Sequence, residues 1–327
     1  MPLTGPLSGL SSFGQKDSSA HKQTAYSYAF RGDGDIFDQA ASQNLPRILK
    51  QARDPSARGP IPVIARDETT YHQLLLAREA HMGELDANFQ EANGAVKGID
   101  GLLSQVRKDK AALQKMDPRD PRVQADLSTA HAQEDQLLNI RPKSVAARDT
   151  WKAQLDASYL TPIIQPKHSP IKDLDPHNSK LYVLGHGFAN GDKLSSTASG
   201  DATFSLKDVA KGLKEDGLHP AFESFRMPSC HSADTENRPS FVENPPARTY
   251  SGTAPAQTFA NELKSAGFSS PKVTGYQGAG KRVPDGRTAE RVTSDNSDVA
   301  RRSEVAKVFT PESQLVANTL GFMSKLF

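Results

Sequence analysis

The chain of 327 residues has a single cysteine, Cys230. One cysteine cannot form an intramolecular disulfide, and it excludes a metal site built from several thiolates. The sequence therefore suits a reducing compartment. A lone cysteine is more often an inert buried residue than a nucleophile, so the neighbours of Cys230 must decide its role.

Long apolar runs and an excess of one charge are also lacking. No run approaches the ~20 apolar residues of a membrane helix, and no basic segment followed by an apolar one marks a secretory signal peptide. The 40 Lys and Arg residues oppose 38 Asp and Glu residues, which leaves a formal net charge of +2. A general nucleic-acid binder would be more basic. We therefore expect no nucleic-acid binding and no membrane span.

Changes in composition divide the chain into four parts. Residues 1–24 are rich in Ser, Gly, Thr and Pro, which predicts a disordered leader. Residues 25–67 begin an α/β core, residues 68–160 have a helical pattern, and residues 161–327 continue the core to a C-terminal helix. Within the second part we expect a short helix near 38–53 and a buried strand at 61–65.

The part from 68 to 160 predicts a helical hairpin or small bundle, added to the core as an arm. Two prolines in the stretch 116–122 end a first helix. A second helix follows from Val123 to Leu138, and a third candidate carries Trp151. The arm is either a structural spacer or a docking surface for a host protein. The first helix has apolar residues three and four positions apart, interrupted by glycines: Met82, Leu85, Phe89, Ala92, Val96, Ile99, Leu103, Val106 and Leu113.

From residue 161 to 280, strand and helix signals alternate. This order predicts a mainly parallel sheet with helices on its faces. Residues 281–306 are polar and charged and predict a loop, and an amphipathic helix is expected at 312–327. The predicted strands lie within 161–166, 181–185, 221–227 and 272–276, and the predicted helices cover 205–217 and 255–268.

Two of these strands run into residues that can carry out chemistry. One ends in Gly185-His186-Gly187 and the other in Ser229-Cys230. The carboxyl ends of parallel strands share one edge of a sheet, where ligands bind. An imidazole beside a thiol raises its thiolate fraction and later protonates a leaving amine. The amides of Gly187 and Cys230 can then stabilise an oxyanion.

The motifs LGHG and SCHSA, separated by one helix and each at the end of a strand, resemble the two catalytic blocks of caspase-like (clan CD) cysteine peptidases. The resemblance covers about residues 160–280. It implies that His186 is the catalytic histidine, Cys230 the nucleophile and Gly187 an oxyanion donor. The expected function is cysteine endopeptidase cleavage of a protein substrate, without metal or organic cofactor.

Two departures from this family matter. Pro228 stands where metacaspases carry an acidic residue that selects basic P1 side chains, so no P1 preference follows. Ala233 is a milder change. We expect Ser229 and Tyr276 to contact the substrate at the same edge. The leader is similar in composition to those of bacterial injected effectors, which implies secretion into a host cytosol without a cleaved signal peptide; otherwise the protein is cytoplasmic.

Other interpretations of the sequence stay open. Residues 275–281 fit the phosphate-loop pattern G-x-x-x-x-G-K, but Arg282 stands where Ser or Thr would bind magnesium. Arg31 and the tract 195–199 resemble elements of ADP-ribosyltransferases, without their paired acidic motif. A non-enzymatic helical scaffold with a degenerate α/β domain is a further alternative. A zinc site is conceivable from five residues without metal-site spacing: His177, His186, His219, Cys230 and His231.

The region 281–302 is rich in basic residues. We expect a solvated loop face, or a polyphosphate site like that of toxin self-processing domains. The residues of this basic cluster are Lys281, Arg282, Arg287, Arg291, Arg301 and Arg302.

Overall fold

The computed structural model describes residues 25–236, 240–241, 252–281, 290–293, 296 and 298–312. The predicted leader 1–24 lies outside the described residues. So does the predicted C-terminal helix 312–327, apart from Glu312 itself, which is not helical.

A seven-stranded sheet forms the centre of the molecule, in the order β12-β8-β7-β4-β1-β2-β3. Every neighbouring pair is parallel except β12 and β8. The predicted mainly parallel sheet flanked by helices is therefore confirmed. The strands are β1 (Ala25–Ala29), β2 (Val63–Ala65), β3 (Ile163–Ile164), β4 (Lys180–Val183), β7 (Ser224–Arg226), β8 (Lys272–Tyr276) and β12 (Ala306–Phe309).

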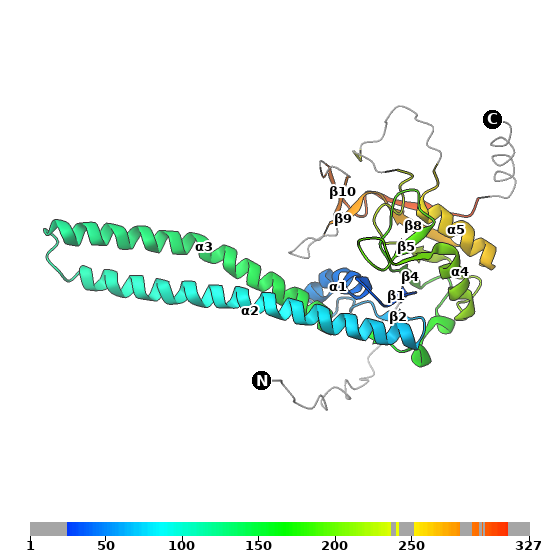
Figure 1. The fold of residues 1–327 in the computed structure, drawn as a ribbon, viewed down its shortest axis with the longest axis horizontal. Helices are drawn as coiled ribbons and strands as arrows, with labels where there is room; N and C mark the ends of the chain where they lie inside the picture. Colours follow the sequence, from blue (N-terminus) through cyan, green and yellow to red (C-terminus); the bar gives the residue numbers. More distant parts are fainter. Residues whose placement is uncertain are drawn as a thin grey trace.

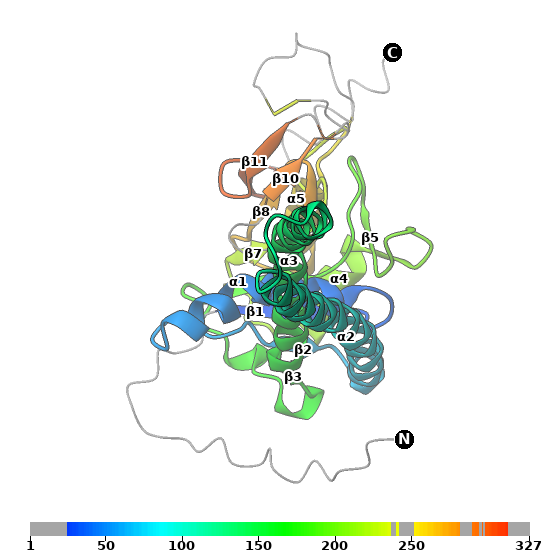
Figure 2. The ribbon, with the colours of Figure 1, turned by 90° about the vertical axis from the view of Figure 1, so that its left-hand side faces the viewer.

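Helices cover both faces of this sheet (Figure 2). On one face lie α4 (Leu206–Glu215) and α5 (Pro255–Ala266), close to their predicted bounds. Phe225 of β7 packs edge-on against Phe259 of α5 in the core beneath them. On the other face, α1 (Ile36–Arg53) buries Ile36 and Phe37 against β1, β2 and the start of the next helix.

Two long helices leave this body as a hairpin (Figure 1). They are α2 (Glu68–Leu113) and α3 (Pro121–Leu160), with 46 and 40 residues. At 1.5 Å per residue, α2 is about 70 Å long. The apolar stripe predicted along it is at least partly buried at all nine positions, with Val96, Ile99 and Leu103 among the buried ones.

The prediction of separate second and third helices after residue 120 is wrong, because α3 is continuous. Pro142 lies inside it and is exposed. On that side, water can satisfy the backbone carbonyl that the proline leaves unbonded. The arm is thus a two-helix hairpin.

Two small antiparallel sheets complete the described fold. The prediction of a loop at 281–306 is wrong in part, because β10, β11 and β12 lie within or begin in it. Strands of three or four residues are too short to show a periodic pattern, and their pairing is decided by distant segments. The remaining elements are β5 (Lys193–Ser195) with β6 (Thr203–Ser205); β9 (Ala279–Lys281), β10 (Glu290–Val292) and β11 (Val299–Arg301); and the 3-10 turns η1 (Pro166–His168) and η2 (Ile171–Asp173).

A search of the described helices finds none with the length and apolar character needed to cross a membrane.

Candidate active site

The two predicted motifs leave the sheet side by side. Strands β4 and β7 are direct parallel neighbours, with Leu181 opposite Phe225. The segments that follow them therefore begin at the same edge. The backbone of His186 then pairs with Ser195 of β5 in both directions, at 2.7 and 2.9 Å, which fixes the histidine loop.

Gly187 packs directly against the cysteine segment. A Cβ atom at this position would lie 2.5 Å from the carbonyl oxygen of Cys230 and 2.9 Å from the Cβ of Ser229. Only a residue without a side chain permits this approach. The amides of Gly187 and Cys230 donate no hydrogen bond to any residue that the structure describes, so both are available to a ligand.

His186 and Cys230 line one cavity of about 440 Å³. Its walls come from three regions: the two strand ends, α1 with the last turns of α3, and the β9–β11 sheet with the segment that follows it. The arm therefore contributes to the cavity through Trp151 and Gln154 near its base, which the sequence analysis did not foresee.

A short loop holds Cys230 in place by bonding to the chain after β8. His231 has a left-handed backbone with φ of 54°, and its amide donates to the carbonyl of Gly278 at 2.9 Å. The buried carboxylate of Asp234 accepts a hydrogen bond from the Gly278 amide at 2.7 Å and contacts the His231 ring at 2.9 Å. The His231 ring is thus paired with Asp234.

The sulfur of Cys230 has a polar environment. The Gly280 amide donates to Sγ at 3.3 Å. The buried guanidinium of Arg291 holds the same segment by donating to the carbonyls of Pro228 and Ser229 at 2.6 and 3.2 Å. Burial lowers the pKa of Arg291 to about 10, assisted by repulsion from Arg302 and opposed by attraction to Cys230. Arg291 is still a cation at neutral pH, so the segment that carries Cys230 lies beside a positive charge.

The imidazole of His186 lies beside a carboxylate. Its Nε2 is 3.3 Å from Oδ2 of Asp35, within ion-pair distance but without hydrogen-bond geometry. That same Oδ2 accepts the amide of Ala198 at 3.0 Å, which fixes the carboxylate. Asp35 directly precedes α1 and belongs to no motif that could be recognised in the sequence.

The cavity gathers buried polar atoms that have no hydrogen-bond partner within the described chain. Buried polar groups are paired in most native structures, so their concentration here indicates a place for a polar ligand. These atoms are Nε2 of Gln39, Nε2 and Oε1 of Gln43, Nε2 of His186, Oγ of Ser229, and Nε and Nη2 of Arg302.

The two residues predicted to contact substrate lie differently. Ser229 is buried and lines the cavity. Tyr276 is 3% exposed and lies behind the cavity wall, where its ring supports the guanidinium of Arg302 at 4.1 Å and that of Arg291 at 5.1 Å. A direct contact between Tyr276 and a substrate stays a prediction.

The basic cluster is not a uniformly solvated face, as had been expected. Arg291 is 3% exposed and is engaged by backbone carbonyls, whereas Arg301 is exposed. Lys281 and Arg302 line the cavity. Arg282 and Arg287 lie outside the described residues. The described basic residues lie on or beside the short strands β9, β10 and β11, in which some side chains point inward and others outward.

The phosphate-loop interpretation does not fit the observed geometry. Lys281 ends strand β9 and does not begin a helix. The Gly278 amide, which would have to bind phosphate, donates to Asp234 instead.

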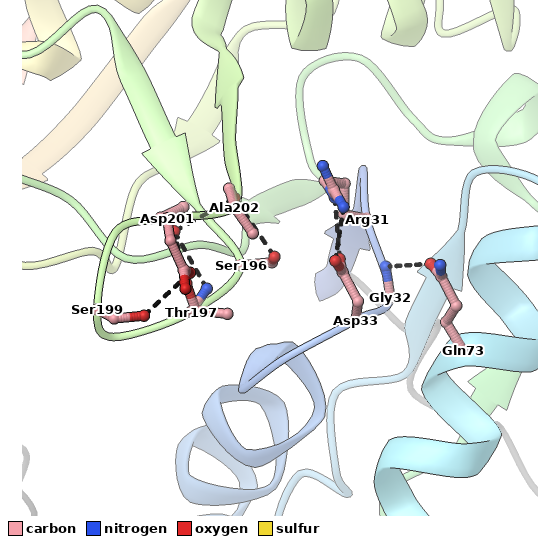
Figure 3. Close-up of polar contacts among 10 residues, drawn as sticks. Arg31, Gly32, Asp33, Gln73, Ser196, Thr197, Ser199, Asp201 and Ala202 are labelled. Atoms are coloured by element: carbon pink, nitrogen blue, oxygen red, sulfur yellow. Dashed lines mark hydrogen bonds and ion pairs between the residues drawn. The ribbon is translucent and has the colours of Figure 1, made fainter.

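The ADP-ribosyltransferase interpretation requires a free arginine on the strand and free hydroxyls in the serine-rich tract. Figure 3 shows instead that Arg31 forms a two-fold pair with Asp33, at 2.9 and 2.6 Å. Burial alone would raise the pKa of Asp33, but hydrogen bonds from Arg31 and Ser196 and the Arg31 charge lower it below its ordinary value. The hydroxyl of Thr197 donates to Asp201 of its own turn.

A search of the described residues finds no group of three or more His, Cys, Asp or Glu side chains that could hold a metal ion. The five residues considered for zinc are not brought together as such a group.

No protein-family model, no curated protein and no solved structure matches this chain. The function of the protein must therefore be inferred from the site itself.

Proposed function

We propose that this protein is a caspase-like cysteine endopeptidase, with Cys230 as nucleophile and His186 as acid and base. The observation that carries the proposal is the close approach of Gly187 to the Cys230 carbonyl, together with a cavity that the His186 and Cys230 side chains both line. A parallel sheet with His-Gly and Cys at the ends of neighbouring strands supports the same assignment.

In the proposed reaction, the Cys230 thiolate attacks the scissile carbonyl carbon, and the carbonyl electron pair moves onto oxygen. The Gly187 and Cys230 amides donate to that oxyanion. His186 gives its proton to the leaving amine, and an acyl-thioester remains on Cys230. A water molecule, deprotonated by His186, then hydrolyses the thioester and restores the thiol.

The surroundings of each group support this division of labour. The Gly280 N–H donates to the Cys230 sulfur, and the Arg291 cation interacts with the same residue. The Asp35 carboxylate lies 3.3 Å from the His186 imidazole, within ion-pair distance.

The test is the rate at which iodoacetamide alkylates Cys230 at about pH 6, where an ordinary thiol is almost wholly protonated. We expect Cys230 to react faster than glutathione, and His186→Ala to remove the excess. His168→Ala, which changes an exposed histidine that does not line the cavity, is the matched control. A Cys230 as slow as glutathione would favour the scaffold interpretation. Peptide-library cleavage by wild type, absent from Cys230→Ala, then establishes the endopeptidase.

A further inference from the structure

The part of the cavity between α1 and the base of α3 is almost uncharged. Asp38 is the one charged residue that α1 contributes to the described lining, and α3 contributes none. Asp38 itself lies 3.4 Å from His81 of α2, within ion-pair distance. A ligand that extends from Cys230 toward the arm therefore meets a neutral surface.

Helix α1 presents two glutamine side chains to this neutral part. Gln39 and Gln43 are four positions apart in the helix, so they are neighbours on one face. The Oε1 atom of Gln39 accepts a hydrogen bond from the Gly185 amide at 3.0 Å, which fixes the orientation of the side-chain amide. Its Nε2 atom is buried and donates to no described residue.

The Gln43 side chain lacks a partner for both of its polar atoms. Nε2 and Oε1 are buried, and neither has a hydrogen-bond partner within the described chain. Leaving a buried amide unbonded is costly. A donor and an acceptor on one planar group match a second amide, which offers an N–H and a C=O in return. An ionised carboxylate only accepts hydrogen bonds, so it would leave Oε1 of Gln43 unsatisfied.

The arm supplies an apolar surface beside these glutamines. Trp151 and Ala157 of α3 line the cavity together with Leu45 of α1. Leu45 and Ala157 also belong to a small buried cluster that joins the two helices, so this wall is held in place. A neutral amide with an apolar neighbour suits both kinds of surface.

We propose that the space between α1 and the base of α3 is a binding site for a neutral amide, in which Gln43 exchanges two hydrogen bonds with the ligand. Gln39 offers its Nε2 as a further donor. Two ligands share this chemistry: a peptide group of a bound polypeptide, and the carboxamide of an Asn or Gln side chain. The inference concerns binding and holds whether or not Cys230 is a nucleophile; under the proposed function the ligand is the substrate.

The experiment tethers matched probes to the protein by a disulfide. The chain has one cysteine, so Cys230 alone is labelled. The probes are mercaptoalkanoic acid derivatives with linkers of increasing length, each made as the N-methylamide, the primary amide, the N,N-dimethylamide and the methyl ester. The last two have no N–H. Each probe competes with 2-mercaptoethanol for Cys230 at equilibrium, and intact-protein mass gives the labelled fraction.

Probes of one linker length carry the same thiol, so the ratio of their labelled fractions measures what the end group contacts. The reactivity of Cys230 cancels from this ratio. At the linker length that reaches Gln43, we expect an N–H-bearing amide to be retained about tenfold more than the dimethylamide and the ester. Stronger retention of the N-methylamide assigns the site to a peptide group, and stronger retention of the primary amide assigns it to a side-chain carboxamide.

Gln43→Met keeps the length of the side chain without its polar atoms and should remove the preference. Gln105→Met, which changes an exposed glutamine of α2 outside the cavity, should retain all of it. Thermal unfolding shows whether each variant is folded, and Gln43→Ala gives the answer if the methionine variant is not.

Trp151 gives a second measurement, because it is the only tryptophan of the chain. A tethered amide that occupies the proposed site should shield Trp151 from quenching by acrylamide more than the tethered dimethylamide does. This readout locates the ligand beside the arm, which the labelled fraction alone does not.

Equal retention of all end groups at every linker length would overturn the inference, as would a preference that survives in a folded Gln43→Met protein. Quenching of Trp151 that is the same with every end group would place the amide elsewhere and also overturn it. Failure of the peptidase proposal looks different, because slow alkylation by iodoacetamide at about pH 6 leaves the equilibrium between the probes unchanged.

Discussion

The contact between Gly187 and the cysteine segment predicts a large effect from a single methyl group. In Gly187→Ala the new Cβ would lie 2.5 Å from the Cys230 carbonyl oxygen, with Ser229 Cβ and Oγ at 2.9 Å. Ordinary van der Waals contact is about 3.5 Å, so the two segments must separate by about 1 Å. Overpacking of this kind costs roughly 1–3 kcal/mol in stability. A displacement of about 1 Å at a catalytic centre can cost about 100-fold in rate.

The matched control is Gly191→Ala in the same loop, where the nearest atom to the new Cβ is the Phe188 carbonyl oxygen at 3.2 Å. We expect Gly187→Ala to lose most of the excess alkylation rate of Cys230 and about 100-fold in peptide cleavage. Its thermal midpoint should fall by several degrees. The control should stay close to wild type in all three. If both variants alkylate and unfold alike, the packing of the two motifs is not what the structure indicates.

Three further predictions concern the rest of the molecule. Gly98 of α2 has open space around its Cβ position, so Gly98→Ala should stabilise the hairpin by about 0.5–1 kcal/mol. The measurement is the midpoint of thermal unfolding followed by circular dichroism, which should rise. A lower midpoint would contradict the continuous helix. The Asp216 carboxylate accepts a hydrogen bond from the Tyr28 hydroxyl at 2.6 Å, and burial raises the pKa of Asp216. The folded state therefore binds the carboxyl proton of Asp216 more tightly than the unfolded state does. The free energy of unfolding should fall as pH rises above about 4. Asp216→Asn should flatten that decline in urea unfolding, whereas a curve parallel to wild type would refute the assignment. Arg291→Met removes the donor to the carbonyls of Pro228 and Ser229, whereas the Gly278 carbonyl keeps the His231 amide. The variant should cost about 3 kcal/mol in urea unfolding, against little change for the exposed Arg301→Met. An equal loss in both would be inconsistent with the buried role of Arg291.

The sequence predicted those parts of the fold that carry a regular pattern or a strong end signal. In α4, Ser205 caps the helix by accepting from the Asp208 amide, and in α5 the left-handed Gly267 ends it. The apolar stripe along α2 is also a local signal, because its nine residues recur mostly three and four positions apart. These signals are local, so they can be read without knowledge of the partner segments.

The parts that were missed depend on distant pairing. Strand β10 has three residues and pairs with β9 and β11, and its Arg291 is buried against the segment before Cys230 and the ring of Tyr276. Charge composition alone favours an exposed loop there, and tertiary contacts override that preference. Pro142 lies on the exposed side of the long, packed helix α3 and does not end it.

The candidate site shows the same division. The placement of His186 and Cys230 at one cavity could be proposed because the carboxyl ends of neighbouring parallel strands meet at one edge of the sheet. The supporting groups could not be foreseen. Asp35, Gly280 and Arg302 reach the site from three segments with no shared motif, and each is placed by contacts made far from it in the sequence.

The position of the arm follows from how the cavity is closed. The sheet edge supplies His186 and Cys230 but forms only one side of the cavity. Helices α4 and α5 do not close it, because they lie over the face opposite α1. Ala157 and Ser158, in the last turns of α3, are nearly fully buried, and with Trp151 they close the cavity on the side of α1. A helix anchored in this way cannot shift along its axis without altering the cavity. The distal part of the hairpin does not line the cavity. Its helix–helix packing can therefore change without altering the shape of the site.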